Sequence, residues 1–271
     1  MAALGFALAA VAGLLLGLLG GGGSILTVPI LVYAFGLEAK RAIAVSLGVV
    51  GVISLLGAIG HWRAGRVNGR VAVLFGGFAM AGAYAGARLA AFVTGPAQLT
   101  VFAAAMLAAA VSMLRSTTSG PERTPEPMQA QPLAAASAAL AVGVFTGLVG
   151  IGGGFLIVPA LVVFVGLPMK EAIGTSLAVI AMNATAGLAG YAGLVDPPWT
   201  VMAGFIAAAS IGMAAGTSLV GVVPAAALRR TFAVVLVVVG TSILFQNRHV
   251  LVPNAPAVAP ERPPTVTGAH R

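Results

Sequence analysis

The sequence contains no cysteine, which excludes disulfide bonds, thiolate metal sites and cysteine nucleophiles. Charged residues are scarce as well. They make up 7% of the chain, whereas soluble domains carry roughly 25%. Hydrophobic residues make up 59%. This composition predicts a protein whose solvent is the lipid bilayer.

Acidic residues are the rarest charged group. There are six of them, and Glu38, Glu171 and Asp196 stand at the ends of apolar runs rather than inside them. The sequence therefore offers no carboxylate at the centre of a membrane segment that could bind a cation there. It also has no cluster of metal-ligating residue types, and we expect neither a metal ion nor a cofactor.

The net charge of +8 comes from basic residues that lie between apolar runs or near the end of the chain. This placement is typical of cytoplasmic loops in membrane proteins, and we expect no nucleic-acid partner.

Apolar segments recur along the chain at lengths near those that cross a bilayer. They predict an all-α, polytopic membrane protein. The segments lie near 2–19, 24–36, 39–60, 71–92, 97–115, 133–149, 154–166, 170–192, 199–220 and 225–246.

The segments form two groups. The first repeat occupies 1–115 and the second 133–246; a polar linker rich in Pro, Ser and Thr joins them at 116–132, and a Pro-rich tail that we expect to be disordered follows at 247–271. The repeats align at a constant offset of 130. Over the 44 pairs from Gly17/Gly147 to Gly60/Gly190, 20 are identical. The sequence is therefore an internal duplication.

The relative direction of the repeats depends on whether the short segments 24–36 and 154–166 cross the membrane. If they do not cross, each repeat makes four passes and the repeats are parallel. If they cross, each makes five passes and the second copy is inverted. Of the twelve Lys and Arg residues that remain when Arg262 and Arg271 are set aside, the five-pass arrangement puts eight on one side and four on the other. The four-pass arrangement splits them evenly, so the positive-inside rule favours inverted repeats.

Each repeat contains a glycine-rich break inside an apolar region: Gly20, Gly21, Gly22 and Gly23 with Ser24 in the first, and Gly150, Gly152, Gly153 and Gly154 in the second. Glycine costs about 1 kcal/mol relative to alanine inside a helix. Broken helices at corresponding positions of two repeats indicate a transporter's substrate site. Free amide groups and the positive end of a helix dipole would attract an anion there.

The alternative role of glycine in a membrane helix is to let neighbouring backbones touch. We favour this role for Gly82 and Gly86 in "GAYAG" and for Gly212 and Gly216 in "GMAAG".

The pattern "GLLGGGGSILTVPILVYAFGLEAKRAIAVSL", repeated as "GLVGIGGGFLIVPALVVFVGLPMKEAIGTSL", resembles the sulfite exporter TauE/SafE family. The resemblance covers both repeats. It implies a multi-pass transporter of the inner (plasma) membrane that handles a small sulfur-containing anion, such as sulfite or an organosulfonate. The sequence does not specify which anion, the direction of transport or the coupling ion.

Several other polar residues are candidates for the same site. Ser46 and Ser176 are equivalent in the two repeats, and Thr175 precedes Ser176 where Val45 precedes Ser46. Each hydroxyl either binds the anion or bonds to its own or a neighbouring helix. Asn183 lies in the middle of an apolar segment, where an amide needs a partner. Lys40 and Lys170, also equivalent, either recruit anions at a vestibule or extend to the interface.

The predicted function is secondary transport of a small anion, with substrate and lipid bilayer as partners, and the sequence leaves a homo-oligomer open. A non-transporting scaffold or assembly protein and an ion channel are the alternatives. An intramembrane hydrolase with Ser24 as nucleophile is disfavoured because the repeat equivalent of Ser24 is Gly154.

Overall fold

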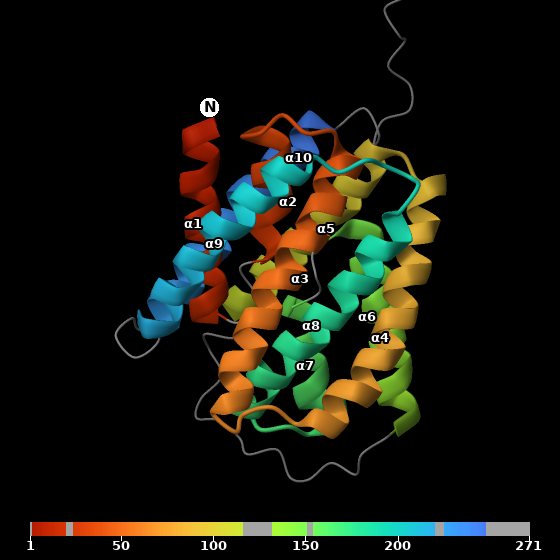
Figure 1. Ribbon diagram of the computed structural model, residues 1–271, viewed down its shortest axis with the longest axis vertical. Coiled ribbons are helices and arrows are strands. Elements are labelled where there is room, and N and C mark those ends of the chain that lie inside the picture. The colour runs from red at the N-terminus through yellow and green to blue at the C-terminus, as the bar shows by residue number, and fades with distance from the viewer. Residues whose placement is uncertain (1, 20–23, 116–131, 151–153, 220–224, 248–271) are drawn as a thin grey trace, which may run out of the picture.

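The computed structural model describes residues 2–19, 24–115, 132–150, 154–219 and 225–247 (Figure 1). These residues are predominantly helical and contain no strand, which confirms the predicted all-α class for this part of the chain. The helices are α1 (Ala2–Leu19), α2 (Thr27–Tyr33), α3 (Ala39–Arg63), α4 (Gly69–Leu89), α5 (Gly95–Arg115), α6 (Pro132–Val149), α7 (Gly154–Ala160), α8 (Met169–Tyr191), α9 (Trp199–Leu219) and α10 (Ala225–Gln246). A 3₁₀ turn, η2 (Ala90–Phe92), extends α4, and a π-helical turn, η4 (Leu161–Val165), extends α7.

The two short apolar segments form shorter helices than their apolar length predicted. Each segment ends at a glycine in the left-handed conformation, with φ of +68° at Gly36 and +76° at Gly166. Such glycines terminate helices because they have no Cβ to clash in this conformation. Residues 116–131 of the predicted linker and 248–271 of the predicted tail lie outside the described residues.

Helices α3 and α8 pack side by side in the middle of the molecule and run in opposite directions (Figure 1). Two of their glycine contacts show the direction. A Cβ added to Gly48 would lie 3.6 Å from Leu188, and one added to Gly57 would lie 3.1 Å from Leu177. Residue numbers thus rise along one helix as they fall along the other. The two helices that align in the sequence are antiparallel neighbours.

Two further helix pairs pack in parallel through glycine. Helix α4 lies along α6, where a Cβ on Gly82 would collide with backbone atoms of Leu140 and Val144. Helix α1 lies along α9, where a Cβ on Gly212 would collide with backbone atoms of Ala10 and Leu14. Gly82 and Gly212 are equivalent at the offset of 130, as are the residues they touch. The predicted packing role of the "GAYAG" and "GMAAG" glycines is therefore confirmed.

Four of the described helical segments are long and apolar enough to cross a membrane: Ala39–Arg63, Gly69–Phe92, Glu171–Tyr191 and Trp199–Gly216. Their outer faces carry large exposed apolar side chains, among them Leu55, Leu74 and Phe78. Side chains of this kind face lipid in membrane proteins, because lipid does not penalise their exposure. Trp62 and Trp199, which are exposed near helix ends, fit the role of interfacial anchors.

Candidate functional site

The first glycine-rich break separates α1 from α2. Gly20, Gly21, Gly22 and Gly23 lie outside the described residues. Immediately after them, residues 24–26 form a single 3₁₀ turn that leads into α2. Ser24 and Thr27 are both buried. Helix α2 is seven residues long and buried from Thr27 to Leu31, so the chain restarts its helix inside the protein.

The second break begins where α6 ends. Gly150 has a φ of +78°, and its N–H donates a hydrogen bond of 2.7 Å to the carbonyl of Thr146. A Cβ at this position would lie 2.5 Å from Ile43 on α3. Both the left-handed conformation and the lack of space require glycine here. Gly152 and Gly153 lie outside the described residues, and Gly154 is the first residue of α7.

Ser46 joins α3 to this second break. Its hydroxyl is fully buried and donates a hydrogen bond of 2.9 Å to the carbonyl oxygen of Gly150. Ser46 therefore binds a backbone group of the break, which would otherwise lack a partner after the helix ends.

A cluster of Gln98, Tyr191 and the Leu148 carbonyl holds the last turn of α6 from the other side. Gln98 Nε2 donates to the Leu148 carbonyl at 2.9 Å and to the Tyr191 hydroxyl at 3.1 Å. The Tyr191 hydroxyl in turn lies 3.2 Å from the same carbonyl and donates to it. Both side chains are buried. The cluster therefore ties α5 and α8 to the end of α6.

Sequence reasoning missed the role of Gln98, which stands at the beginning of an apolar run like many interfacial residues. The available signal was a difference between the repeats, because the equivalent of Gln98 is Leu228. A polar residue replacing an aliphatic one at matched positions indicates a role in only one half.

Asn183 of α8 contacts α6 about one turn before Gly150. Its Nδ2 donates to the hydroxyl of Thr146 at 2.6 Å, and that hydroxyl donates to the Gly143 carbonyl at 2.9 Å. The Asn183 Oδ1 atom is buried and has no hydrogen-bond partner among the described residues. Asn183 thus has one interhelical partner and one spare acceptor, as assigned from the hydrogen-bond network.

Thr175 and Ser176 lie at the other end of α8. Thr175 Oγ1 accepts a hydrogen bond of 2.9 Å from the N–H of Asn68, while Ser176 donates to the Ile173 carbonyl of its own helix at 2.8 Å. Of the candidates, the structure gathers Ser46, Gly150 and Asn183 at the end of α6. Thr175 and Ser176 lie about 11 Å along α8 from Asn183, at about 1.5 Å of rise per residue. Lys40 is partly exposed in the first turn of α3, and Lys170 belongs to the first turn of α8.

A cavity of about 480 Å³ opens between α1, α3 and α9. We call it the His61 cavity. Its polar lining consists of His61, Arg66 and Ser210, and Gly17 of α1 also lines it. Gly17 stands three residues before the first glycine of the break. The cavity therefore has one arginine and one histidine in its lining, beside the last turns of α1.

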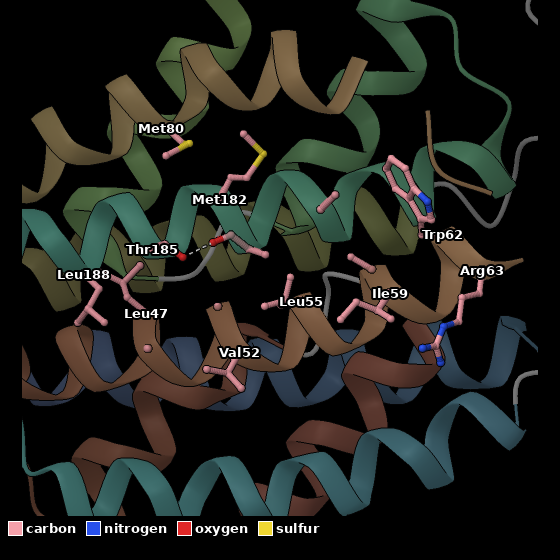
Figure 2. A pocket seen from close by; sticks show the side chains of 15 residues that line it. Leu47, Val52, Leu55, Ile59, Trp62, Arg63, Met80, Met182, Thr185 and Leu188 are labelled. Atoms are coloured by element: carbon pink, nitrogen blue, oxygen red, sulfur yellow. Dashed lines mark hydrogen bonds between the residues drawn. The ribbon is translucent and has the colours of Figure 1, made fainter. Parts of the chain in front are cut away.

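A larger cavity of about 740 Å³ lies between α3, α4 and α8. Figure 2 shows Leu47, Val52, Leu55 and Ile59 pointing into it from α3, with Trp62 and Arg63 at one end. The hydroxyl of Thr185 is already bonded to the Ala181 carbonyl. This aliphatic lining suits hydrocarbon rather than an anion.

Over the described residues, these features define a helical protein with four helices long and apolar enough to cross a membrane and a cavity lined by His61, Arg66 and Ser210. A family model described as "Sulfite exporter TauE/SafE" matches residues 5–243. The chain belongs to this family.

Similar proteins are described as probable membrane transporters. A "Probable membrane transporter protein" of Xylella fastidiosa strain Temecula1 is 32% identical over 239 residues, covering 87% of this chain and 92% of the relative. The "Probable membrane transporter protein YdhB" of Bacillus subtilis is 26% identical over 239 residues, covering 86% and 96%. No solved structure matches the chain.

Proposed function

We propose that this protein is a multi-pass secondary transporter of the inner membrane that carries a small anion, a sulfur oxyanion or organosulfonate such as sulfite. Membership of the sulfite exporter family supports the transport class and the choice of substrate. The relatives described as membrane transporters support the class. One structural observation supports an anionic substrate. The His61 cavity has Arg66 and His61 in its lining, beside the last turns of α1.

The two halves are inverted repeats in this proposal. Helices α3 and α8 align in the sequence and are antiparallel in space, which is the relation expected of inverted copies. Asn68 Nδ2 also donates to Glu171 Oε1 at 3.1 Å, so the loop after α3 and the start of α8 lie at the same end of the molecule. Parallel repeats would place these two segments at opposite ends.

The segments at that shared end contain the basic residues Arg63, Arg66, Arg70 and Lys170. By the positive-inside rule it faces the cytoplasm. The His61 cavity therefore opens toward the cytoplasm.

The substrate site of this proposal is the pair of glycine breaks near the centre of the membrane. Amide groups of Gly20 to Gly23 and Ser24, and of Gly152 to Gly154, hold the anion. Gly150, whose N–H is bonded to the Thr146 carbonyl, ends α6 and so shapes the second break. Ser46 and Asn183 supply polar groups beside the second break. Thr175 and Ser176 lie about 11 Å farther along α8 and line the path to the site, and Lys40 and Lys170 attract the anion at the vestibules. Burial of Ser24 and Thr27 supports a site inside the protein, where an anion would meet these groups without competing water.

Flux measurements with matched glycine replacements test this proposal. Gly22→Leu and Gly152→Leu place bulky side chains at the breaks, and Gly77→Leu serves as the control because a Cβ there meets nothing within 4 Å. In proteoliposomes we expect both break variants to lose nearly all flux of radiolabelled sulfite and the control to retain it. Unchanged flux in the break variants would reject the site. Wild-type flux equal to that of protein-free liposomes would reject sulfite as substrate, and the assay would then be repeated with sulfonates.

A further inference from the structure

The two halves of the molecule differ clearly at one pair of equivalent positions, Gly60 and Gly190. A Cβ on Gly190 would lie 2.5 Å from Ala87 and 3.0 Å from the Tyr84 carbonyl, so α4 presses directly onto the end of α8. A Cβ on Gly60 meets nothing within 4 Å. The equivalent of α4 is α9, and at Gly60 the corresponding space is the His61 cavity, which Ala214 of α9 also lines.

The helix packing shows the same difference on a larger scale. The pair α4 and α6 and the pair α1 and α9 have equivalent internal glycine contacts. However, α4 packs along α8 far more extensively than α9 packs along α3. The pairs α4–α6 and α1–α9 therefore have the same internal packing. They differ in how closely each pair lies against the central helices α3 and α8.

Side chains follow this asymmetry. Tyr191 is 1% exposed and joins Gln98 and the Leu148 carbonyl in the cluster described above. Its equivalent, His61, is partly exposed and lines the open cavity; its Nδ1 atom is buried and has no hydrogen-bond partner among the described residues. The same position of the repeat is thus sealed at one end of the molecule and open at the other.

We propose that these two positions are the gates of the transporter. The cluster of Gln98, Tyr191 and the Leu148 carbonyl is the closed outer gate, and His61 stands at the open inner gate. Transport exchanges the two states: α9, with α1, moves onto α3 and closes the His61 cavity, while α4, with α6, leaves α8 and breaks the cluster. This assignment rests on the proposed transport function, and it identifies Gln98 and Tyr191 as gating residues that do not contact the substrate.

The absence of native cysteine makes single-cysteine labelling a direct test. In detergent-solubilised protein, where a maleimide reaches both ends of the molecule, the reagent should modify Gly60→Cys at least about tenfold faster than Gly190→Cys, because a buried site reacts only when its cover opens. Equal labelling rates would overturn the assignment of an open and a closed gate. Labelling is measured without substrate, so it does not depend on finding the transported anion. Equal labelling rates would reject the gate assignment even if the protein transports an anion.

A second set of variants covers the case in which Gly190→Cys does not fold. Tyr191→Phe combined with Gln98→Leu removes the hydrogen bonds of the outer gate while keeping the side chains close in size. If the gates exchange, the population shifts away from the inner-open state and labelling of Gly60→Cys slows by about tenfold. The control is Tyr84→Phe. The Tyr84 hydroxyl accepts hydrogen bonds from Arg88 at an exposed position, and its removal should leave the rate unchanged.

Closure of the His61 cavity by α9 can be trapped with a crosslinker. Gly60→Cys and Ala214→Cys face the same cavity, and a short thiol crosslinker should join them as α9 moves onto α3. Crosslinking should stop transport, and reduction or cleavage of the linker should restore it. Two results together would overturn the proposal. One is a labelling rate at Gly60→Cys that is the same with and without the outer-gate substitutions, and the other is crosslinked protein that transports at the wild-type rate.

Discussion

Replacement of Gly82 by alanine tests the helix packing that frames the transporter. The new Cβ would collide with backbone atoms of Leu140 and Val144 on α6. A backbone cannot rotate aside as a side chain can, so α4 and α6 must separate. Overpacking of this kind costs about 1–3 kcal/mol, and in a chain of this size each kcal/mol shifts the melting temperature by roughly 2–4 °C. We expect Gly82→Ala to lower the melting temperature by about 5 °C.

Thermal unfolding in detergent, followed by the fluorescence of Trp62 and Trp199, measures this effect. Gly212→Ala is the equivalent change at the α1–α9 contact and should cost a similar amount. Gly77→Ala lies on the same helix as Gly82 but in open space. It should leave the melting temperature unchanged or raise it, because alanine is favoured over glycine inside a helix by about 1 kcal/mol. If Gly82→Ala and Gly77→Ala melt alike, backbone contact between α4 and α6 does not stabilise the fold.

Three smaller predictions follow from single contacts. Ser46→Ala removes the bond to the Gly150 carbonyl and should cost about 1 kcal/mol of stability; a melting temperature equal to that of the wild type would contradict this. Asn183→Leu should change stability by less than about 1 kcal/mol, as membrane hydrogen bonds are modest, but should strongly reduce anion flux; retained flux would mean that Asn183 only joins two helices. Gly36→Ala should cost about 1–2 kcal/mol, because its φ of +68° is unfavourable for other residues; no loss in the melting temperature would refute this.

Much of the fold followed from apolar length alone. The predicted segment 39–60 is α3 (Ala39–Arg63), and the predicted segment 199–220 is α9 (Trp199–Leu219). A helix in lipid must satisfy its backbone internally over the whole apolar stretch, so its ends coincide with the ends of that stretch. The spacing of Gly82 and Gly86 also indicated close packing, because small residues one turn apart form a flat strip on a helix.

The partner of each helix could not be predicted in the same way. Gly82 shows that α4 packs closely against something, but nothing local specifies α6 rather than α1. The gate residues were hidden for a related reason. Gln98 and Leu148 are 50 positions apart, and the bond between them depends on a carbonyl whose availability follows from where α6 ends. The sequence pattern located the breaks but not the contacts that close one side of them.

Radiolabelled sulfite counterflow in proteoliposomes tests the central claim most directly. Vesicles loaded with unlabelled sulfite are diluted into a trace of labelled sulfite, and the internal label is followed with time. A carrier with alternating gates should accumulate label transiently above its equilibrium level, and the Gly22→Leu and Gly152→Leu variants should abolish this peak. Label that rises only to equilibrium would indicate a channel, and the absence of protein-dependent uptake for sulfite and every sulfonate tried would contradict the account.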